Sequence, residues 1–184
     1  MSTQPPPVAY QIDFADRVYI VNRASFDAFA AENGQPALAS RVHGTPLWHH
    51  IHGAEVSAIY RALIKTCRMD RCPRSFPFRC DAPGIERHMT MRMWSPDGRR
   101  VEFVTFVEHE VTRAPIALLD VAAPRDDRVI VICAWCHAVA VHYVWVPLET
   151  AVGMLGLFGS APIPMLSHGV CPECATTFMQ LRPP

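Results

Sequence analysis

The sequence predicts an α+β protein made of a five-stranded antiparallel sheet with helices and a small cysteine-bearing unit at the C-terminal end. Three observations carry this prediction. Segments that alternate in period two follow a long helical segment within the first 121 residues. The stretch "AAPRDDR" at 122–128 then forms a polar, proline-bearing break. Beyond the break, four cysteines occur as two pairs, each with two residues between its members.

Composition limits the class of protein. With 184 residues, of which 50% are hydrophobic, the chain is long enough for one domain and a small appendage. The 17 basic and 17 acidic side chains cancel, so no net field attracts nucleic acid or an anionic membrane. The start of the chain lacks a signal-peptide pattern, and no apolar run reaches the roughly 18 residues of a membrane span. We therefore expect a cytoplasmic protein that binds neither nucleic acid nor membranes, with a disordered proline-rich leader at 1–7.

The first unit opens with two strands and a helix. "YQIDF" and "VYIVN" place β-branched and aromatic residues on either side of the polar turn "ADR", which predicts two strands. Ser25 is the predicted cap of a helix over "FDAFAAEN", and Gly34 follows where that helix should end.

A longer helix is predicted over residues 54–69. Its apolar residues recur at helical spacing, and its basic residues lie on another face. One side of the helix is therefore expected in the core and the other in water. The apolar face comprises Val56, Ile59, Tyr60, Leu63 and Cys67.

Three further strands are predicted from "SFPFRC", "RHMTMRMW" and "VEFVTFVEHE", because each alternates in period two. The turn sequences "APG" and "SPDG" separate them and favour antiparallel pairing. We expect Trp48 to cover the helical side of the resulting core. The strand residues are predicted to include Ile12, Phe14, Val18, Phe76, Phe78, Met91, Met93, Phe103 and Val104.

The order of two strands, helices and three strands resembles a PAS domain, a sensory fold, over residues 8–121. The best local match to that family is "IDFADRVYIVNRASFDAFA". The resemblance implies an antiparallel sheet that cradles a small cavity beneath several helices, where a small-molecule ligand would bind. It implies no catalytic motif. Residues 122–128 would then be a linker to the second unit at 129–184.

The second unit is predicted to hold a metal ion through Cys133, Cys136, Cys171 and Cys174. Each C-x-x-C pair can grip one ion from a tight turn, and two pairs supply four thiolates. Soft sulfur ligands favour zinc over calcium, magnesium or manganese, and four of them leave no position for a catalytic water. The seven cysteines are an odd number, which in a reducing compartment also favours metal binding over disulfides. We expect a structural zinc site in a zinc-ribbon-like unit.

The second unit also resembles a zinc-binding tail that follows PAS or receiver domains in bacterial signalling proteins. The matching stretches are "ICAWC", "WVPLE" and "SHGVCPEC", within residues 130–176. The chain departs from that pattern at His137, where the family usually has Lys or another polar residue, and in its apolar hairpin "AVAVHYV". The hairpin is expected to pack on the first unit or on a second subunit. A strand at 129–136, a helix at 148–155 and a loop up to Cys171 complete the unit.

Other interpretations of "CAWCH" fit less of the chain. A covalent haem needs export and accounts for neither Cys171 nor Cys174. A thioredoxin-like disulfide pair would begin a helix, and a zinc deaminase needs an H-x-E motif that the chain lacks. His168 or His137 remains an alternative metal ligand, or a residue that orients a ligand.

A few residues outside the cysteine pairs are candidates for other sites. His50 and His52 in "WHHIH", or His88, would be the axial ligand of a noncovalent haem. Cys67, Cys72 and Cys80 would form a thiol redox sensor close to several arginines. No set of residues forms a catalytic constellation, so the prediction is a noncatalytic signalling protein whose output needs a protein partner or self-association. An enzyme that uses the PAS-like cavity is the competing class.

Overall fold

A computed structural model of the chain describes residues 6–157 and 162–181. Its first sheet has five strands in the order β2-β1-β5-β4-β3, and every neighbouring pair is antiparallel. The α+β class and the five-stranded antiparallel sheet are therefore confirmed. The strands are β1 (Val8–Ile12), β2 (Val18–Ile20), β3 (Arg74–Arg79), β4 (Ile85–Trp94) and β5 (Val101–Thr112).

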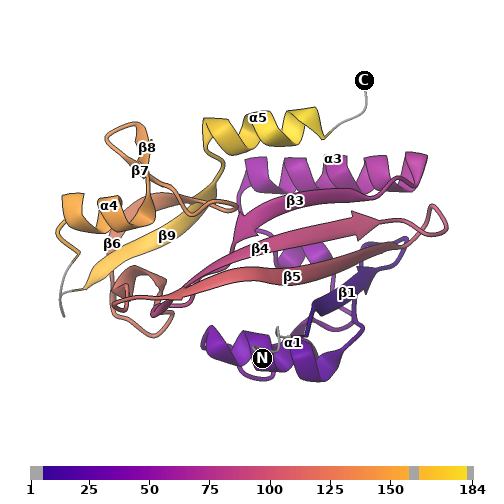
Figure 1. The fold of residues 1–184 in the computed structure, drawn as a ribbon, viewed down its shortest axis with the longest axis horizontal. Helices are drawn as coiled ribbons and strands as arrows, with labels where there is room; N and C mark the ends of the chain where they lie inside the picture. Colours follow the sequence, from indigo (N-terminus) through magenta and orange to yellow (C-terminus); the bar gives the residue numbers. More distant parts are fainter. Residues whose placement is uncertain (1–5, 158–161, 182–184) are drawn as a thin grey trace.

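Helical segments connect β2 to β3 and pack their apolar residues against the sheet. Figure 1 shows α1 near β1, at one end of the sheet, and α3 near β3, at the other end. The long helix predicted over 54–69 is present and ends one residue later. The segments are α1 (Arg23–Glu32), α2 (Leu38–Val42), the 3-10 helix η1 (Leu47–His49) and α3 (Ala54–Asp70). The buried cluster that they share with the strands includes Ile12, Val56, Leu63, Cys67, Phe76, Met91, Met93 and Phe103.

Two local expectations for the first unit are wrong. Asn22, and not Ser25, caps α1: its side chain accepts a hydrogen bond of 3.2 Å from the backbone N–H of Ser25. Phe14 lies beyond the end of β1 and is 68% exposed, with the guanidinium of Arg99 5.3 Å from its ring centroid. An aromatic residue in a two-residue-period run is therefore not always a strand residue, because the turn to β2 begins at Asp13.

Trp48 lies on the helical side of the core, as expected, but it is only partly buried. Its Nε1 donates a hydrogen bond of 2.9 Å to Asp16, and Arg61 lies 3.7 Å above its ring. The indole therefore packs its body on the core and keeps a polar partner for its N–H.

The C-terminal unit contains a second, four-stranded sheet in the order β8-β7-β6-β9. β6 and β9 are parallel, whereas the other pairs are antiparallel. The loop expected before Cys171 is therefore wrong for residues 163–169, and a helix that was not expected follows them. The elements are η2 (Ala117–Leu119), β6 (Arg125–Cys133), β7 (Val139–Val141), β8 (Val144–Val146), α4 (Leu148–Met154), β9 (Ile163–Gly169) and α5 (Pro172–Gln180).

The predicted boundary at 122–128 lies inside packed structure. β6 begins at Arg125, so this range is not a free linker over its full length. Ile116 and Leu118, which precede the break, pack in the buried cluster of the second sheet. The predicted disordered leader lies outside the described residues except for Pro6 and Pro7.

The two units meet along the edge strand β3. The backbone N–H of Arg79 donates a hydrogen bond of 2.6 Å to the carbonyl of Trp135, and Pro77 has no N–H to offer at this edge. The ring of Phe178 in α5 lies 5.0 Å from that of Phe76 in β3. Figure 1 shows α5 beside α3, and residues of both helices line one small pocket. An edge that would otherwise be open to another strand is thus covered by the second unit.

Candidate metal centre

Four cysteine sulfurs come together where β6 and α5 meet. The Sγ atoms of Cys133, Cys136, Cys171 and Cys174 all lie within 4.8 Å of one another, and those of Cys136 and Cys171 are 3.6 Å apart. A tetrahedral ion with metal–sulfur bonds of about 2.3 Å requires sulfurs about 3.8 Å apart. The tetrad is therefore compatible with a structural metal ion.

The first pair is presented by a tight turn after β6. Cys133 ends the strand, and the N–H of His137 donates a hydrogen bond of 3.1 Å to its carbonyl. His137 takes a left-handed conformation, with φ of 61°, which closes the turn. The N–H of Cys133 also donates a hydrogen bond of 2.7 Å to Ala138. The backbone thus fixes both ends of the segment that carries Cys136.

The second pair lies at the N-terminus of α5. Cys171 is the N-cap, and its sulfur accepts a hydrogen bond of 3.4 Å from the N–H of Cys174. Pro172 occupies the first turn, where a missing N–H has no cost. Because the N-terminus of a helix carries partial positive charge, this position favours a thiolate.

Local donors stabilise negative charge on the sulfur of Cys133, one of the four. The N–H of Cys171 donates a hydrogen bond of 3.4 Å to the sulfur of Cys133, and the thiols of Cys136 and Cys174 lie within 4.8 Å of the same atom. The neighbouring thiols of Cys136 and Cys174, together with the N–H of Cys171, hold the pKa of the Cys133 thiol well below its usual value. Cys133 and Cys171 are both buried. The same contacts with Cys133 raise the pKa of the Cys136 thiol to about 12 and that of the Cys174 thiol well above its usual value, so a bound cation would have to displace protons from those sulfurs.

Neither candidate histidine joins the sulfurs in the described part of the chain. The group of mutually close ligand atoms consists of the four cysteines, without His168 or His137. His168 occupies an exposed position in β9, and partial desolvation of its ring, with the nearby His137 and His52, lowers its pKa. His137 instead faces Asp81, with 3.4 Å between its Nδ1 and Oδ2 of the carboxylate.

The turn between the first two cysteines inserts an aromatic side chain into the first unit. Trp135 is 2% exposed. Its ring stacks on Tyr60 of α3 at 5.6 Å between centroids and contacts Phe178 of α5 at 4.4 Å. Cys133 and Cys171 belong to the same buried cluster as the residues of the first sheet. The candidate metal centre is therefore built into the core of the first unit.

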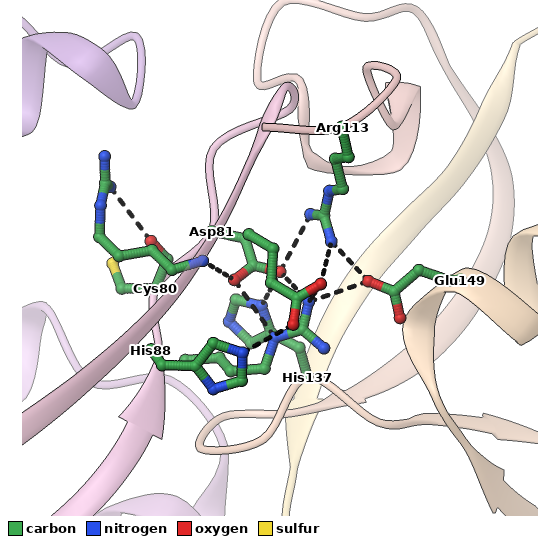
Figure 2. A network of polar contacts seen from close by, with 9 residues as sticks. Cys80, Asp81, His88, Arg113, His137 and Glu149 are labelled. Atoms are coloured by element: carbon green, nitrogen blue, oxygen red, sulfur yellow. Dashed lines mark hydrogen bonds and ion pairs between the residues drawn. The ribbon is translucent and has the colours of Figure 1, made fainter. Parts of the chain in front are cut away.

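A buried carboxylate links the two units beside the metal centre (Figure 2). Asp81 lies in the turn between β3 and β4, and its side chain is fully buried. Oδ2 lies 2.5 Å from Arg79 and 3.0 Å from Arg113, and its third neighbour is His137. Figure 2 shows Arg113 between Asp81 and Glu149 of α4. The network therefore joins the first sheet to both the metal-binding turn and α4.

The charge of Asp81 is well compensated. Burial opposes its ionisation, but the nearby His137 and hydrogen bonds from Arg79 and the backbone of Arg87 outweigh that effect, so its pKa falls well below the usual value. Arg87 is itself buried and bonds to Glu32 and Glu110 at 2.6 and 2.5 Å. These residues were not predicted, because a charged residue in a sequence does not reveal a partner far along the chain.

The other candidate residues do not assemble into a site. His50 bonds to Thr45 at 2.6 Å, and His88 bonds to Glu86 at 2.6 Å on the exposed side of β4. Cys67 is fully buried and Cys72 is exposed. Burial raises the pKa of the thiols of Cys67 and Cys80 to about 11, so neither is a reactive thiolate at neutral pH.

No protein-family model matches the chain, and comparisons with curated proteins and with solved structures also give no match. None of the helices in the described ranges is long and apolar enough to cross a membrane. The fold and the site therefore define an α+β protein with a tetrad of cysteines that can hold a metal ion.

Proposed function

We propose that the protein is a noncatalytic bacterial signalling protein in which a PAS-like sensory unit carries a structural zinc centre. The observation that carries this proposal is the position of Trp135, which lies between two metal ligands in sequence and is buried in the core of the first unit. A conformational change in the sensory unit would therefore move Trp135 and, with it, the turn that binds the metal.

Zinc is the ion that best suits the tetrad. Four thiolate sulfurs are the usual ligands of closed, tetrahedral structural zinc, and they disfavour hard cations. Cys133 and Cys136 would hold the ion from the turn, and Cys171 and Cys174 from the start of α5. The ion would supply a cross-link between β6 and α5, and its binding energy would become folding energy of the C-terminal unit.

The PAS-like assignment is supported by the element order and by the sheet. Two strands, helical segments and three strands follow one another, and the strands form one antiparallel sheet. Hollows of about 280 and 370 Å³ lie on the helical side. A small-molecule ligand would bind there, and a protein partner or a second copy of the chain would receive the signal.

A cytoplasmic location fits the chemistry of the cysteines. All seven are free thiols, and a reducing compartment keeps such thiols available for metal. A closed shell of four sulfurs offers no position for a catalytic water, which supports a structural role for the metal and a regulatory role for the protein.

Native mass spectrometry of the purified full chain, together with elemental analysis and an absorption spectrum, tests the proposal. One zinc per chain and no haem absorption band are the expected results. A chain that folds fully without metal, or one that chemically converts a molecule bound in the hollows, would contradict it.

A further inference from the structure

Two adjoining hollows lie between the first sheet and the helical segments. Their volumes are about 280 and 370 Å³, close to the lower end of the range of about 300–1,000 Å³ for ligand pockets. Tyr10, Phe26 and Leu38 line both hollows. The two spaces therefore adjoin at these side chains.

The lining is mostly apolar, and its polar side chains include the amides of Asn33 and Gln35, the histidines of the larger hollow and a few hydroxyl groups without protein partners. Thr105 is 6% exposed and lines the smaller hollow. It follows Val101 and Phe103 on the buried face of β5. Neither its hydroxyl nor those of Tyr10 and Tyr60, which line the larger hollow, hydrogen-bonds to any residue in the described ranges.

These hydroxyls are open to solvent, since the buried side-chain atoms without a partner in the part of the chain that the structure describes are Arg113 Nε and His137 Nδ1. A ligand that covers the hydroxyls without offering an acceptor would bury them without a hydrogen bond, at a cost of about 1–3 kcal/mol each. A molecule that offers an oxygen to these hydroxyls avoids that cost. The hydroxyl groups can therefore distinguish a ligand with an acceptor from a plain hydrocarbon.

The lining also selects against charge. Among the described residues, neither hollow is lined by Asp, Glu, Lys or Arg, and the side chains there that can become cations are the exposed histidines of the larger hollow. A buried ion without a counter-charge pays a desolvation penalty of several kcal/mol. A neutral ligand fits this lining and a charged one does not.

Aromatic rings define the shape of the space. Tyr10 stacks on Phe103 with 4.6 Å between centroids and 7° between planes, and Phe26, Phe29 and Phe78 lie around it. Flat faces of this kind stack on flat ligands.

We propose that the two hollows bind one neutral molecule with a flat apolar body and an oxygen acceptor, which accepts hydrogen bonds from Thr105 and Tyr10. The inference rests on the proposed function, because it names the class of ligand that the sensory unit recognises. Burial and the nearby Tyr60 raise the pKa of Tyr10 well above its usual value, and burial raises the pKa of Tyr60 to about 12. Both phenols therefore stay protonated and can donate at neutral pH.

The site also has a direct route to the metal centre. Tyr60 lines the larger hollow and stacks on Trp135, which lies between Cys133 and Cys136. A ligand beside Tyr60 is thus separated from the metal-binding turn by two side chains.

Three probes with the same ring system test the ligand class: 2-acetylnaphthalene, 2-ethylnaphthalene and naphthalene-2-carboxylate. Each is titrated into the full chain, purified with its metal, and followed by backbone amide NMR shifts. We expect the ketone to shift the amides of Thr105 and Tyr10. We expect the carboxylate to bind at least about tenfold more weakly, because its charge has no partner in the lining.

Matched variants test the hydrogen bonds. Thr105→Val and Tyr10→Phe should each weaken binding of the ketone about three- to tenfold, the effect of one hydrogen bond, and should not weaken binding of 2-ethylnaphthalene. Tyr143→Phe, at a fully exposed tyrosine, is the control and should change neither. Thermal unfolding of each variant shows that it is folded.

Three results would overturn the inference: no probe shifts the Thr105 amide, the carboxylate binds as tightly as the ketone, or the variants weaken the ketone and the hydrocarbon by the same factor. The last two would show a site of another class and leave the proposed sensory role standing. If elemental analysis found no zinc in the purified chain, the proposed function would be wrong. The binding data for the probes would still stand.

Discussion

The ring of Trp135 stacks on the ring of Tyr60, with 5.6 Å between their centroids and 23° between their planes. Trp135 comes from the metal-binding turn, and Tyr60 comes from α3 of the first unit. The two units of the protein therefore share one hydrophobic core at this point and are not independent domains.

Trp135→Ala is expected to lower the free energy of unfolding by about 3–5 kcal/mol, because it leaves a large cavity between Tyr60 and Phe178. Urea denaturation of the metal-loaded protein measures this loss. Trp145→Ala is the control: Trp145 is only half-buried in β8, so its loss should be smaller. Equal decreases in the free energy of unfolding for the two substitutions would contradict a special role of Trp135 in joining the two units.

Removal of metal ligands should remove the metal. Cys133→Ser and Cys174→Ser each break the tetrad, so elemental analysis should find the zinc lost and hydrogen exchange should find the region after Arg128 unfolded, because binding contributes folding energy. Cys72→Ser, at an exposed cysteine outside the tetrad, should keep one zinc ion per chain. Full occupancy in a variant that lacks two of the four thiols would contradict the assignment.

The sequence was sufficient for features whose partners are near in the chain. The C-x-x-C spacing identified all four sulfurs that the fold brings together, because each pair needs only one tight turn. The period-two segments identified β3, β4 and β5 because turn sequences join neighbouring antiparallel strands. These features depend on local geometry.

Features with distant partners were missed. β9 contains a Pro and a Gly, which predict a loop. It nevertheless pairs in parallel with β6, which lies some 36 residues earlier, as in the pair Val131 and Ser167. Asp81 is another case, since its environment comes from Arg113, His137 and α4. No local pattern contains this information, because the stabilising contacts exist only after the chain has folded.

The buried carboxylate gives a prediction about the contact between the units. Asp81→Asn should destabilise the protein by about 3 kcal/mol at pH 7, because Arg79 and Arg113 lose a buried counter-charge. Asp127→Asn, at an exposed position in β6, is the control and should stay within about 0.5 kcal/mol. Denaturant titrations of both variants measure these differences.

The effect of Asp81 should also depend on pH in a defined direction. Its pKa in the folded protein is lowered, so its stabilisation is complete above the ordinary carboxyl pKa and declines as the pH falls below it toward the folded value. The difference between the wild-type protein and Asp81→Asn should therefore shrink below about pH 4. A difference that grows on acidification would contradict the ion-pair network.

The thiols should differ strongly in reactivity. With metal bound at pH 8, N-ethylmaleimide should modify exposed Cys72 first, and Cys67 and Cys80 should resist because burial raises the pKa of each to about 11. Their modification should increase only as the pH approaches that value. Mass spectrometry after a short pulse identifies the modified residues, and the tetrad should react only after a chelator removes the metal. Rapid modification of Cys67 at pH 8 would support a thiol sensor in its place.

The start of α3 provides a test of direct backbone contact between the units. Gly53 has a φ of +91°, and a Cβ there would lie 2.5 Å from the carbonyl oxygen of His168 in β9. Gly44 has a φ of +79° with nothing within 4 Å of its would-be Cβ, so it is a matched control. Both alanine substitutions pay about 1–3 kcal/mol for the left-handed backbone, but Gly53→Ala must also push β9 away.

Gly53→Ala should therefore cost more stability than Gly44→Ala, with the difference measured in urea. Because β9 leads directly into Cys171, the displacement should also weaken zinc binding in Gly53→Ala and not in Gly44→Ala, as a competition titration with a chromophoric chelator would detect. Equal stability and equal zinc affinity in the two variants would mean that β9 moves freely from α3. In that case the metal centre would be held to the first unit through the Trp135 contacts and the Asp81 network alone.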